Sequence, residues 1–381
     1  MRIVPIHPEH ASRLQQPSID RTRASSPVLP ASPTNGAAVL LDRLGRPFTD
    51  LRISVTDRCN FRCPYCMPRT VYGPEHRFLP YDDILTFEEL TRLAGVFASL
   101  GMRKLRITGG EPLMRKDLPR LISMLKDVAQ RGGDPLDMAL TTNGALLARH
   151  AAELKAAGLR RITVSLDALD DDLFRAMSDS QTSVTVVLEG IEAAQRVGLA
   201  SVKVNMVVRR GCNEDQILPM AEYFSGQGVE LRFIEYMDVG TSNGWRMHEV
   251  MSAPEMLTVL KRRFDLSSLA REPGDTAMRF IDRASGATFG IIASITSPFC
   301  GDCARLRLSS DGRLRTCLFA PDGHDLRALL RQGESDETLA SFIARLWTAR
   351  SDRYSEVRTS PHSHATDPAP GPRPEMSYIG G

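Results

Sequence analysis

The chain has 381 residues, of which 42% are apolar and 25% charged, the composition of an ordinary globular protein. No stretch approaches the roughly 20 apolar residues that a membrane-spanning helix needs, and a net charge of +2 is too small to favour non-specific binding to nucleic acid or membranes. We therefore expect neither a membrane nor a nucleic-acid partner, and an anionic ligand would need a local group of Lys and Arg.

Most of the seven cysteines fall into two close groups. An odd number of cysteines in a long chain does not suggest the disulfide framework of a small secreted protein. We expect metal binding in a reducing compartment instead, and hence a cytoplasmic protein. The first group is Cys59, Cys63 and Cys66, the second is Cys300, Cys303 and Cys317, and the isolated Cys212 is expected to be a free thiol.

Residues 1–38 are predicted to be a disordered tail, because six prolines interrupt any apolar period there. Beyond this tail, six runs have the apolar and polar pattern of strands. They are Leu51–Thr56, Lys104–Thr108, Met138–Thr142, Arg161–Ser165, Val202–Val208 and Leu231–Tyr236. Amphipathic helical periods separate them, for example over residues 118–125 and 184–191. Such an alternation predicts parallel βαβ units.

Six strands are too few for the usual closed eight-stranded barrel, so the predicted fold is α/β, an open, partial (β/α)6 TIM-like barrel. We assign this core to residues 39–245, a C-terminal extension with the second cysteine group to residues 246–330, and a helix with a flexible tail to residues 331–381. Chemistry gathers at the carboxyl ends of parallel barrel strands. The segments that follow the first four strands would converge there: the first cysteine group, Gly109–Pro112, Thr141–Gly144 and Ser165–Asp167.

The first cysteine group has the spacing C-x3-C-x2-C. Three thiolates this close can hold one face of a cubane iron–sulfur cluster and leave the fourth iron without a protein ligand, free to chelate a small molecule. A zinc site that takes a ligand from elsewhere is the alternative. Gly109 and Gly110, directly after the second strand, would let the backbone approach a ligand closely.

On these motifs the chain resembles the radical S-adenosylmethionine superfamily. The resemblance implies a 4Fe–4S cluster on the first cysteine group, whose open iron binds the amino and carboxylate groups of S-adenosyl-L-methionine. Reduction would then release a 5′-deoxyadenosyl radical. The implied cofactor-binding residues are Tyr65, Gly110, Ser165 and Met237.

The second cysteine group has the spacing C-x2-C-x13-C. This spacing alone leaves zinc, with His324 as the nearby candidate for a fourth ligand, and iron–sulfur equally open. Because the first group already implies iron–sulfur assembly, we favour a second 4Fe–4S cluster, again with one open iron. Arg305 and Arg307 alternate on a predicted strand beside it and suit contact with a phosphate or a purine edge, a solvated strand face being the alternative.

The two cysteine groups, Arg305 and Arg307, the run Met237–Gly240 and the terminal Gly-Gly together resemble the GTP 3′,8-cyclases of molybdenum cofactor biosynthesis. The resemblance covers residues 40 to 330 and the last few residues. It implies that the radical takes hydrogen from C3′ of GTP and that C3′ then attacks C8 of guanine. The product is (8S)-3′,8-cyclo-7,8-dihydroguanosine 5′-triphosphate.

The family pattern implies GTP contacts by Arg52, Arg106, Thr141, Lys203, Arg232, Arg305 and Arg307, and a catalytic role for Gly380 and Gly381 in the active site. Four of these cations lie inside predicted strands, where an inward-facing charge is costly unless an anion neutralises it. Salt bridges with strand acids such as Glu235 are the alternative. The resemblance also implies an electron donor of the flavodoxin or ferredoxin type, a homodimer, and hand-over of the product to the cyclic pyranopterin monophosphate synthase.

Two other functions stay open at this point. One is a peptide-modifying radical enzyme with two clusters, although such maturases usually carry more auxiliary cysteines. The other is a non-enzymatic iron–sulfur or zinc protein. His362 and His364 lie in a stretch that departs from the family pattern, and we expect a linker there rather than a metal site.

Overall fold

The computed structural model describes residues 39–131, 133, 135–271, 274–358 and 373–380. The predicted tail at residues 1–38 lies outside this range, as do His362, His364 and Gly381, and the structure does not bear on them. Among the described helices, none combines the length and apolar character that crossing a membrane requires.

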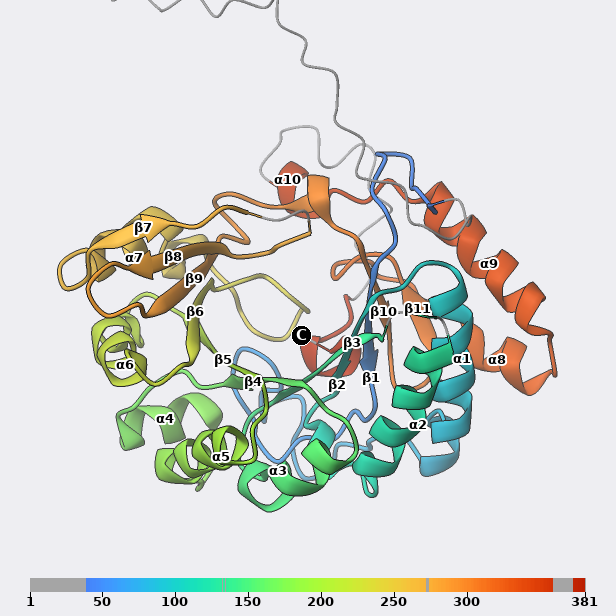
Figure 1. Ribbon diagram of the computed structural model, residues 1–381, viewed down its shortest axis with the longest axis horizontal. Helices are drawn as coiled ribbons and strands as arrows, with labels where there is room; N and C mark the ends of the chain where they lie inside the picture. The colour runs from blue at the N-terminus through green and yellow to red at the C-terminus, as the bar shows by residue number, and fades with distance from the viewer. Residues whose placement is uncertain (1–38, 132, 134, 272–273, 359–372, 381) are drawn as a thin grey trace, which may run out of the picture. The chain divides into compact units, whose positions relative to one another are not determined.

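Twelve described strands form one sheet, in the order β12-β11-β10-β1-β2-β3-β4-β5-β6-β9-β8-β7 (Figure 1). The central six are β1 (Asp50–Ser54), β2 (Lys104–Thr108), β3 (Asp137–Thr142), β4 (Arg161–Ser165), β5 (Ser201–Val208) and β6 (Glu230–Glu235). They are parallel and pair in chain order. Since the sheet ends at β12 and β7, which do not pair with each other, the barrel is open, and the predicted fold is confirmed.

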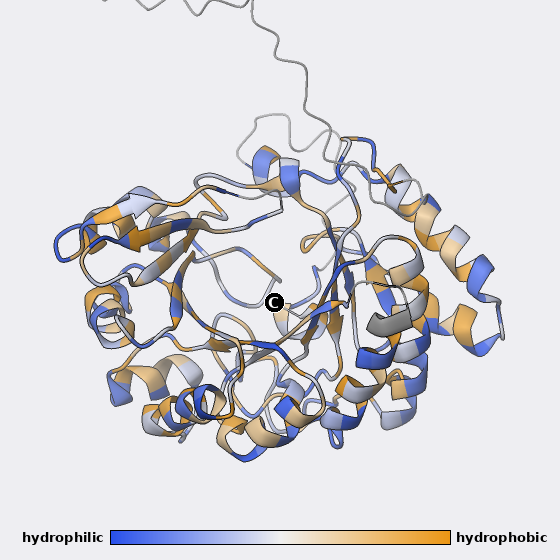
Figure 2. Ribbon diagram, in the orientation of Figure 1, coloured by the Kyte–Doolittle hydropathy of each residue, from blue (hydrophilic) through white to orange (hydrophobic). Residues whose placement is uncertain are grey.

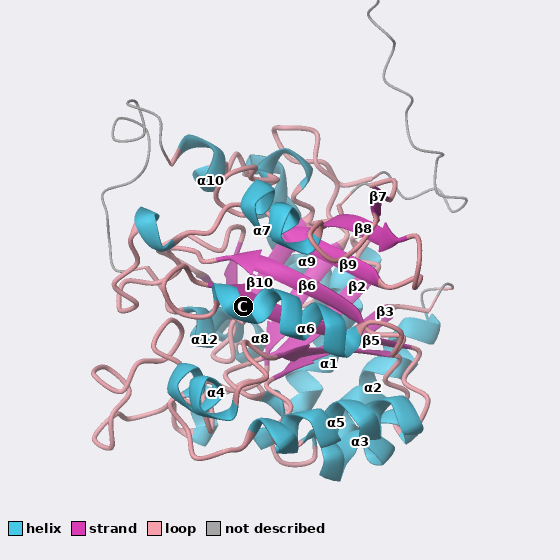
Figure 3. Cartoon of the chain, turned by 90° about the vertical axis from the view of Figure 1, so that its left-hand side faces the viewer, coloured by secondary structure: helices cyan, strands magenta, loops and turns pink. Residues whose placement is uncertain are grey.

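Helices connect these strands and cover the outer side of the sheet (Figure 1 and Figure 3). They are α1 (Phe87–Ser99), α2 (Leu118–Arg131), α3 (Leu147–Ala156), α4 (Asp171–Ser178), α5 (Val184–Arg196) and α6 (Ile217–Phe224). Local signals set their starts. Thr86 begins α1 with a capping box, in which its side chain accepts from the Glu89 N–H and the Glu89 carboxylate accepts from the Thr86 N–H.

Alternation along each strand separates the hydrophobic core from the barrel interior. On β1, Leu51 and Ile53 are buried against the helices, in one cluster with Leu90 of α1 and Leu121 of α2. Arg52 lies between them in sequence and therefore faces the opposite side. Figure 2 shows hydrophobic and hydrophilic residues alternating along the surrounding helices, as amphipathic helices require. This pattern leaves the polar residues of the strands pointing into the barrel.

The C-terminal region extends both edges of the central sheet. β9 (Thr288–Ile292) runs parallel to β6, and β10 (Arg305–Leu308) runs parallel to β1. Antiparallel β8 (Met278–Asp282) and β7 (Leu266–Ser268) continue one edge, and β11 (Arg313–Arg315) and β12 (His324–Asp325) continue the other. Residues 293–304 therefore pass from one edge of the open barrel to the other and carry two cysteines of the second group (Figure 1).

The remaining helices surround this frame. They are α7 (Ala253–Leu260), α8 (Leu326–Arg331), α9 (Asp336–Ala349), α10 (Tyr354–Val357) and α12 (Met376–Ile379), with 3₁₀ turns η1 (Tyr81–Asp83), η2 (Pro112–Met114), η3 (Glu214–Gln216), η4 (Met247–Glu249) and η5 (Cys300–Asp302). α9 packs against α1 on the outside, whereas α12 contacts β1. Figure 1 shows that α12 lies within the curve of the strands, so the C-terminal segment enters the barrel.

Candidate active site

The first cysteine group lies on the loop after β1, where Cys59, Cys63 and Cys66 are partly buried free thiols. The loop turns tightly because the N–H groups of Cys66 and Met67 both donate to the Cys63 carbonyl oxygen, at 2.9 and 2.8 Å. Burial raises the pKa of the Cys59 thiol to about 11 and that of Cys66 to about 12, and it also raises the pKa of Cys63. A metal that binds here would replace these protons.

Gly109 and Gly110 pack against the same loop. A Cβ at Gly110 would clash with the carbonyl oxygen of Arg58, and one at Gly109 would lie 2.9 Å from that of Thr56. The Gly110 N–H donates to the Thr56 carbonyl oxygen at 2.8 Å. The glycines are thus needed for the close approach of two backbones, which fixes the first cysteine group against the end of β2.

Glu111 ties the ends of several strands together. Its buried carboxylate accepts from the Leu113 N–H at 3.0 Å, from Thr142 Oγ1 at 2.7 Å and from the Asn143 N–H at 2.7 Å. Burial raises the pKa of Glu111 to about 7, although these hydrogen bonds act in the opposite direction. Asn143 Nδ2 lies 3.9 Å from Cys59 Sγ, so this carboxylate indirectly holds a donor beside the first cysteine group.

Three of the expected cofactor-binding residues, Tyr65, Ser165 and Met237, follow or end strands of the core. The Tyr65 hydroxyl donates to Asp167 Oδ2 at 2.5 Å, and burial raises the pKa of Asp167 to about 6. Ser165 pairs in register with Asn205 of β5, whose Oδ1 is buried without a hydrogen-bond partner. Met237 follows β6 and is half-buried. A buried acceptor without a partner favours a polar ligand.

Arg307, Arg52 and Arg106 lie side by side on β10, β1 and β2, in register across three parallel strands. Arg52 Nε is buried without a hydrogen-bond partner, and burial together with the charges of Arg305 and Arg307 lowers the Arg52 pKa. Arg106 Nη1 makes long contacts to Thr141 Oγ1 at 3.3 Å and Thr163 Oγ1 at 3.4 Å. None of these three guanidinium groups forms an ion pair with a described carboxylate. The nearby Asp50 carboxylate acts on all three but is paired with Arg305, so the row carries net positive charge.

The other predicted cations have carboxylate partners inside the barrel. Arg305 Nε lies 3.2 Å from Asp50 Oδ2. Lys203 Nζ lies 3.2 Å from one Glu230 oxygen, and Arg232 Nε lies 2.5 Å from the other. The carboxylate that pairs with Lys203 and Arg232 is therefore that of Glu230. The alternative partner expected from the sequence, Glu235, instead accepts hydrogen bonds from the backbone N–H groups of residues 253, 295 and 296.

Two further arginines face the barrel interior and were not predicted from the sequence as site residues. Arg161 begins β4 and pairs with Asp137 at 2.5 Å, while its Nε is buried without a partner. Arg279 of β8 lies 3.6 Å from Glu230, and its Nε is likewise unpartnered. Strand alternation could have found Arg161, because it lies two residues before the inward-facing Thr163. Arg279 had no such signal, since its strand was not predicted.

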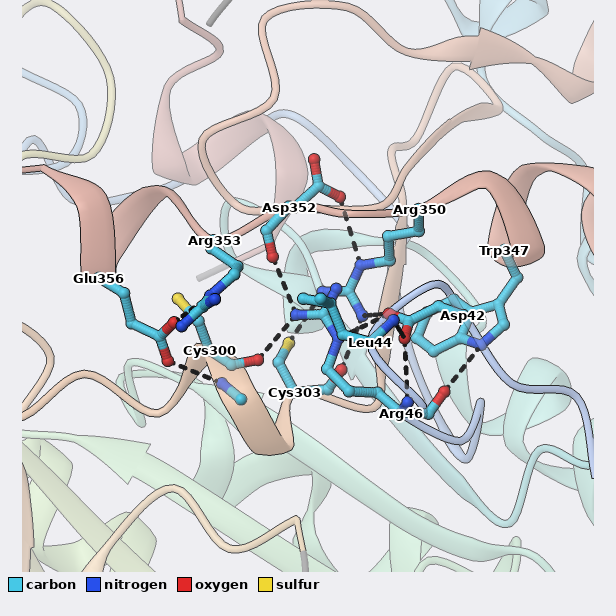
Figure 4. Close-up of polar contacts among 11 residues, drawn as sticks. Asp42, Leu44, Arg46, Cys300, Cys303, Trp347, Arg350, Asp352, Arg353 and Glu356 are labelled. Carbon is cyan, nitrogen blue, oxygen red and sulfur yellow. Dashed lines mark hydrogen bonds and ion pairs between the residues drawn. The ribbon is translucent and has the colours of Figure 1, made fainter. Parts of the chain in front are cut away.

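Two cysteines of the second group, Cys300 and Cys303, accept hydrogen bonds from buried arginines (Figure 4). Arg350 Nη2 donates to Cys303 Sγ at 3.2 Å and its Nη1 to the Cys303 carbonyl oxygen at 2.7 Å, while Arg46 Nη1 donates to the Cys300 carbonyl oxygen at 2.7 Å. Burial acts to raise the Cys303 pKa, but the charges of Arg350 and Arg305 outweigh it and lower that pKa. Burial raises the pKa of Cys317 to about 12.

The C-terminal segment runs from the first cysteine group to the arginine row. The Ser377 backbone N–H is hydrogen-bonded to Cys66. The Gly380 carbonyl oxygen accepts a hydrogen bond from Arg307 Nη1. Glu375 anchors the segment, since its Oε1 accepts from the N–H groups of Thr241 at 2.9 Å and of residue 242 at 3.0 Å. The structure thus brings Gly380 to the predicted site, whereas Gly381 lies outside the described residues.

The described residues do not arrange either cysteine group as the ligands of a single zinc ion. Among the described residues, no three His, Cys, Asp or Glu side chains converge on a point that would hold one metal ion. Zinc needs its ligands about 2.3 Å from one centre, whereas each cysteine of a 4Fe–4S cluster binds a different iron. His324, the candidate fourth zinc ligand, is exposed, and its ring packs against Phe342 at 6.2 Å between ring centroids.

Comparison with known proteins agrees with this geometry. Residues 53–224 match the model of the Radical SAM superfamily, and residues 229–356 match the model named Molybdenum Cofactor Synthesis C. The solved structure of Streptococcus suis SuiB bound to precursor peptide SuiA superposes with a TM-score of 0.54 at 14% identity, over 82% of this chain and 67% of that chain. At this identity the likeness shows the fold alone.

Similarity to curated proteins is much closer. The GTP 3′,8-cyclase of Acidothermus cellulolyticus is 49% identical over 360 residues, which span 89% of this chain and 98% of that protein. The GTP 3′,8-cyclase of Staphylococcus aureus (strain Mu3) is 48% identical over 345 residues, with coverage of 89% and 98%. Together with the matching radical SAM core, these relatives show that the chain belongs to the GTP 3′,8-cyclase family.

Proposed function

We propose that the protein converts GTP into (8S)-3′,8-cyclo-7,8-dihydroguanosine 5′-triphosphate with S-adenosyl-L-methionine as co-substrate, the first step of molybdenum cofactor biosynthesis. Curated relatives named GTP 3′,8-cyclase support this activity. The observation that carries the proposal is the row formed by Arg307, Arg52 and Arg106, which has no ion pair among the described carboxylates. A buried row of guanidinium groups requires an anion, and a triphosphate supplies several charges at once.

We assign GTP binding to the inward-facing side chains of the barrel. Arg305 and Arg307 lie near the second cysteine group, because β10 begins two residues after Cys303, and the Cys303 charge raises the pKa of both. They are therefore assigned to the guanine end of the substrate, and the cations farther along the sheet to the triphosphate. The full set of proposed GTP contacts is Arg52, Arg106, Thr141, Lys203, Arg232, Arg305 and Arg307.

A 4Fe–4S cluster on Cys59, Cys63 and Cys66 would supply the electron that splits S-adenosylmethionine into methionine and a 5′-deoxyadenosyl radical. The residues of the chain bind and orient S-adenosylmethionine. Tyr65 is suited to this because Asp167 fixes its hydroxyl at 2.5 Å. The proposed contacts are Tyr65, Gly110, Ser165 and Met237.

Ring closure requires the ribose and the base of GTP to be fixed together. Once C3′ has lost its hydrogen atom to the deoxyadenosyl radical, the C3′ radical adds to guanine C8, and one electron and one proton complete the dihydro product. A second 4Fe–4S cluster on Cys300, Cys303 and Cys317 would supply an open iron for guanine. Cations at both ends of the substrate would restrict GTP to conformations in which C3′ lies close to C8.

The tail and the partners complete the proposal. Gly380 and Gly381 are assigned a catalytic role, which the contact between Gly380 and Arg307 supports for the first of them. An electron donor of the flavodoxin or ferredoxin type, a homodimer, and hand-over to the cyclic pyranopterin monophosphate synthase are proposed on the family resemblance.

The decisive experiment follows deuterium from the substrate. Anaerobic, cluster-loaded protein is incubated with S-adenosylmethionine, dithionite and GTP deuterated at C3′, with GTP deuterated at C2′ as the matched control. We expect deuterium in 5′-deoxyadenosine from the first substrate only, together with loss of GTP. Formation of 5′-deoxyadenosine without loss of GTP would contradict the proposal.

A triple variant tests the second cluster. With Cys300, Cys303 and Cys317 all changed to Ser, iron content is expected to fall from about eight to about four atoms per chain. The variant should retain the first cluster and form no cyclised product. Normal turnover by this variant would refute the assigned role of the second cysteine group.

A further inference from the structure

The buried arginine network beside the second cysteine group has no role in the binding of GTP proposed above. Arg46 and Arg350 are 2% and 4% exposed, and both contact the carboxylate of Asp42. Arg46 Nε lies 2.6 Å from Asp42 Oδ2, and Arg350 Nη1 lies 3.6 Å from the same oxygen. The two guanidinium groups thus share one fully buried carboxylate, and Arg350 also pairs with Asp352, so the cations of the network are balanced by carboxylates while donors of Arg350 remain directed at the cysteines.

Arg350 is held in one orientation by contacts on every side (Figure 4). Its guanidinium carbon lies 4.6 Å from the centre of the Trp347 ring, and its Nε donates to Asp352 at 3.3 Å. Trp347 is itself fixed, because its indole N–H donates to the Arg46 carbonyl oxygen at 3.2 Å. The guanidinium is therefore rigid, and little conformational freedom is lost when it donates to a sulfur atom.

The two terminal nitrogens of Arg350 both donate to Cys303. Nη1 donates to the Cys303 carbonyl oxygen at 2.7 Å, and Nη2 donates to Cys303 Sγ at 3.2 Å. The first cysteine group receives a different set of donors. There Cys59 Sγ accepts from the Phe61 N–H at 3.4 Å, and Asn143 Nδ2 lies 3.9 Å away, and both of these donors are neutral. In the described residues, a charged side chain donates to a cysteine sulfur at the second group alone.

We propose that Arg350 is a positioning residue for the second cluster, whose charge-assisted hydrogen bond to the Cys303 sulfur raises the reduction potential of that cluster. This inference rests on the second cluster of the proposed function. A 4Fe–4S core in its 2+ state with three thiolates carries a net charge of −1, and one-electron reduction takes it to −2. Because Arg350 is paired with Asp42 and Asp352, its effect on the cluster rests on the hydrogen bond from its guanidinium to the Cys303 sulfur, which stabilises the additional negative charge. Hydrogen bonds to the sulfurs are a known determinant of cluster potential.

The test isolates the second cluster in the full-length chain. Cys59, Cys63 and Cys66 are all changed to Ser, and the protein is loaded with iron and sulfide under anaerobic conditions. Stepwise addition of dithionite, which donates one electron to each cluster, is followed by electron paramagnetic resonance to give the midpoint potential. Arg350→Met, Arg350→Lys and Arg353→Met are compared in this background.

Arg353→Met is the matched control. Arg353 lies on the same segment and pairs at 2.5 Å with Glu356, which lies beside Cys300, but its side chain is 52% exposed and, among the described residues, donates to no cysteine sulfur. We expect Arg353→Met to leave the midpoint unchanged and Arg350→Met to shift it to a more negative value. Arg350→Lys keeps the charge but loses the planar fork that reaches both Cys303 atoms, so its shift should be intermediate.

Each outcome decides the matter. Arg350→Met with full iron and an unchanged midpoint overturns the proposal. If Arg350→Met binds no iron, Arg350→Lys decides, and a midpoint equal to that of its parent overturns the proposal. If the parent protein, which lacks the first cysteine group, binds no iron, the second cluster itself is refuted, and this inference with it. Failure of the proposed function can thus be distinguished from failure of the role of Arg350.

Discussion

Arg307 donates a hydrogen bond to the carbonyl oxygen of Gly380, so β10 and the last described turn of the chain meet inside the barrel. Gly380 has a φ of +71°, and a Cβ on it would clash with Thr108 Oγ1 at the end of β2. Only glycine combines this backbone conformation with so close an approach. The contact therefore depends on the absence of a side chain at the end of the tail.

Gly380→Ala is expected to reduce product formation by about tenfold or more, because strain of about 1–3 kcal/mol disfavours the inserted tail. The melting temperature should stay the same, since the tail can withdraw. Gly333→Ala is the control: its φ is +81° and no atom lies within 4 Å of an added Cβ, so it shares the backbone strain away from the site. Full activity of Gly380→Ala would contradict the role of the tail.

Replacing Arg52 and replacing Arg305 with an uncharged residue should change the unfolding free energy in opposite directions. Arg52→Met removes a buried guanidinium that neighbouring arginines repel, so we expect the unfolding free energy of the GTP-free protein to rise by about 1–2 kcal/mol. Arg305→Met leaves Asp50 without its partner at 3.2 Å, and the unfolding free energy should fall by about 1–3 kcal/mol. Both variants should bind GTP at least tenfold more weakly. Thermal unfolding of cluster-loaded protein and equilibrium binding of GTP measure the two effects, and equal stability changes would contradict the expectation.

Lys203 should make GTP binding depend on pH. Burial and the charge of Arg232 lower the Lys203 pKa to about 8, although Glu230 opposes this shift. Since a triphosphate prefers the protonated amine, affinity should fall by up to about tenfold per pH unit as the pH rises above 8. Lys203→Arg keeps its charge in this range and should lose that part of the dependence. Titrations from pH 7 to 9 on both proteins test this, because ionisation of GTP itself affects both equally; parallel profiles would refute it.

Glu111 should make the folded protein more stable at lower pH. Its pKa is about 7 in the fold, against an ordinary value of 4.5, so the folded state binds the proton more tightly than the unfolded state. The unfolding free energy therefore decreases as the pH rises from 4.5 to 7, and the cost of the buried charge is fully present above 7. Glu111→Gln should flatten the dependence of the melting temperature on pH between pH 5 and 7. A slope identical to that of the parent would show that another group is responsible.

The strands of the core were predictable because their pattern is local. Runs such as Lys104–Thr108 and Arg161–Ser165 agree with β2 and β4 residue for residue, since glycine-rich loops and amphipathic helices bound them clearly. β9 was not predicted, and for β10 the alternation of Arg305 and Arg307 predicted a strand but not its place beside β1. They are short, and what makes them strands is pairing with β6 and β1, across more than 50 and 250 residues of sequence respectively.

Site residues that belong to a sequence motif could be predicted. Residues that reach the site only through the fold were harder to predict. Arg52 and Arg106 were expected to face inward, and their register on β1 and β2 agrees with that. The partner of Lys203 and Arg232 was not foreseen, because Glu230 lies at the start of β6, just before the predicted strand. The contact of Arg350 with Cys303 could not be predicted from the sequence for a related reason. Arg350 lies 47 residues after Cys303, directly after α9.

The two short outer strands at the ends of the sheet have a consequence for solubility. Without residues 266–325, β1 and β6 would each present a free row of N–H and C=O groups to any other chain. β10 and β9 cover those rows, and the sheet then ends in β12, with two residues, and β7, with three. So short a strand is a poor template for pairing. The segment that carries the second cysteine group therefore also protects the barrel from edge-to-edge aggregation.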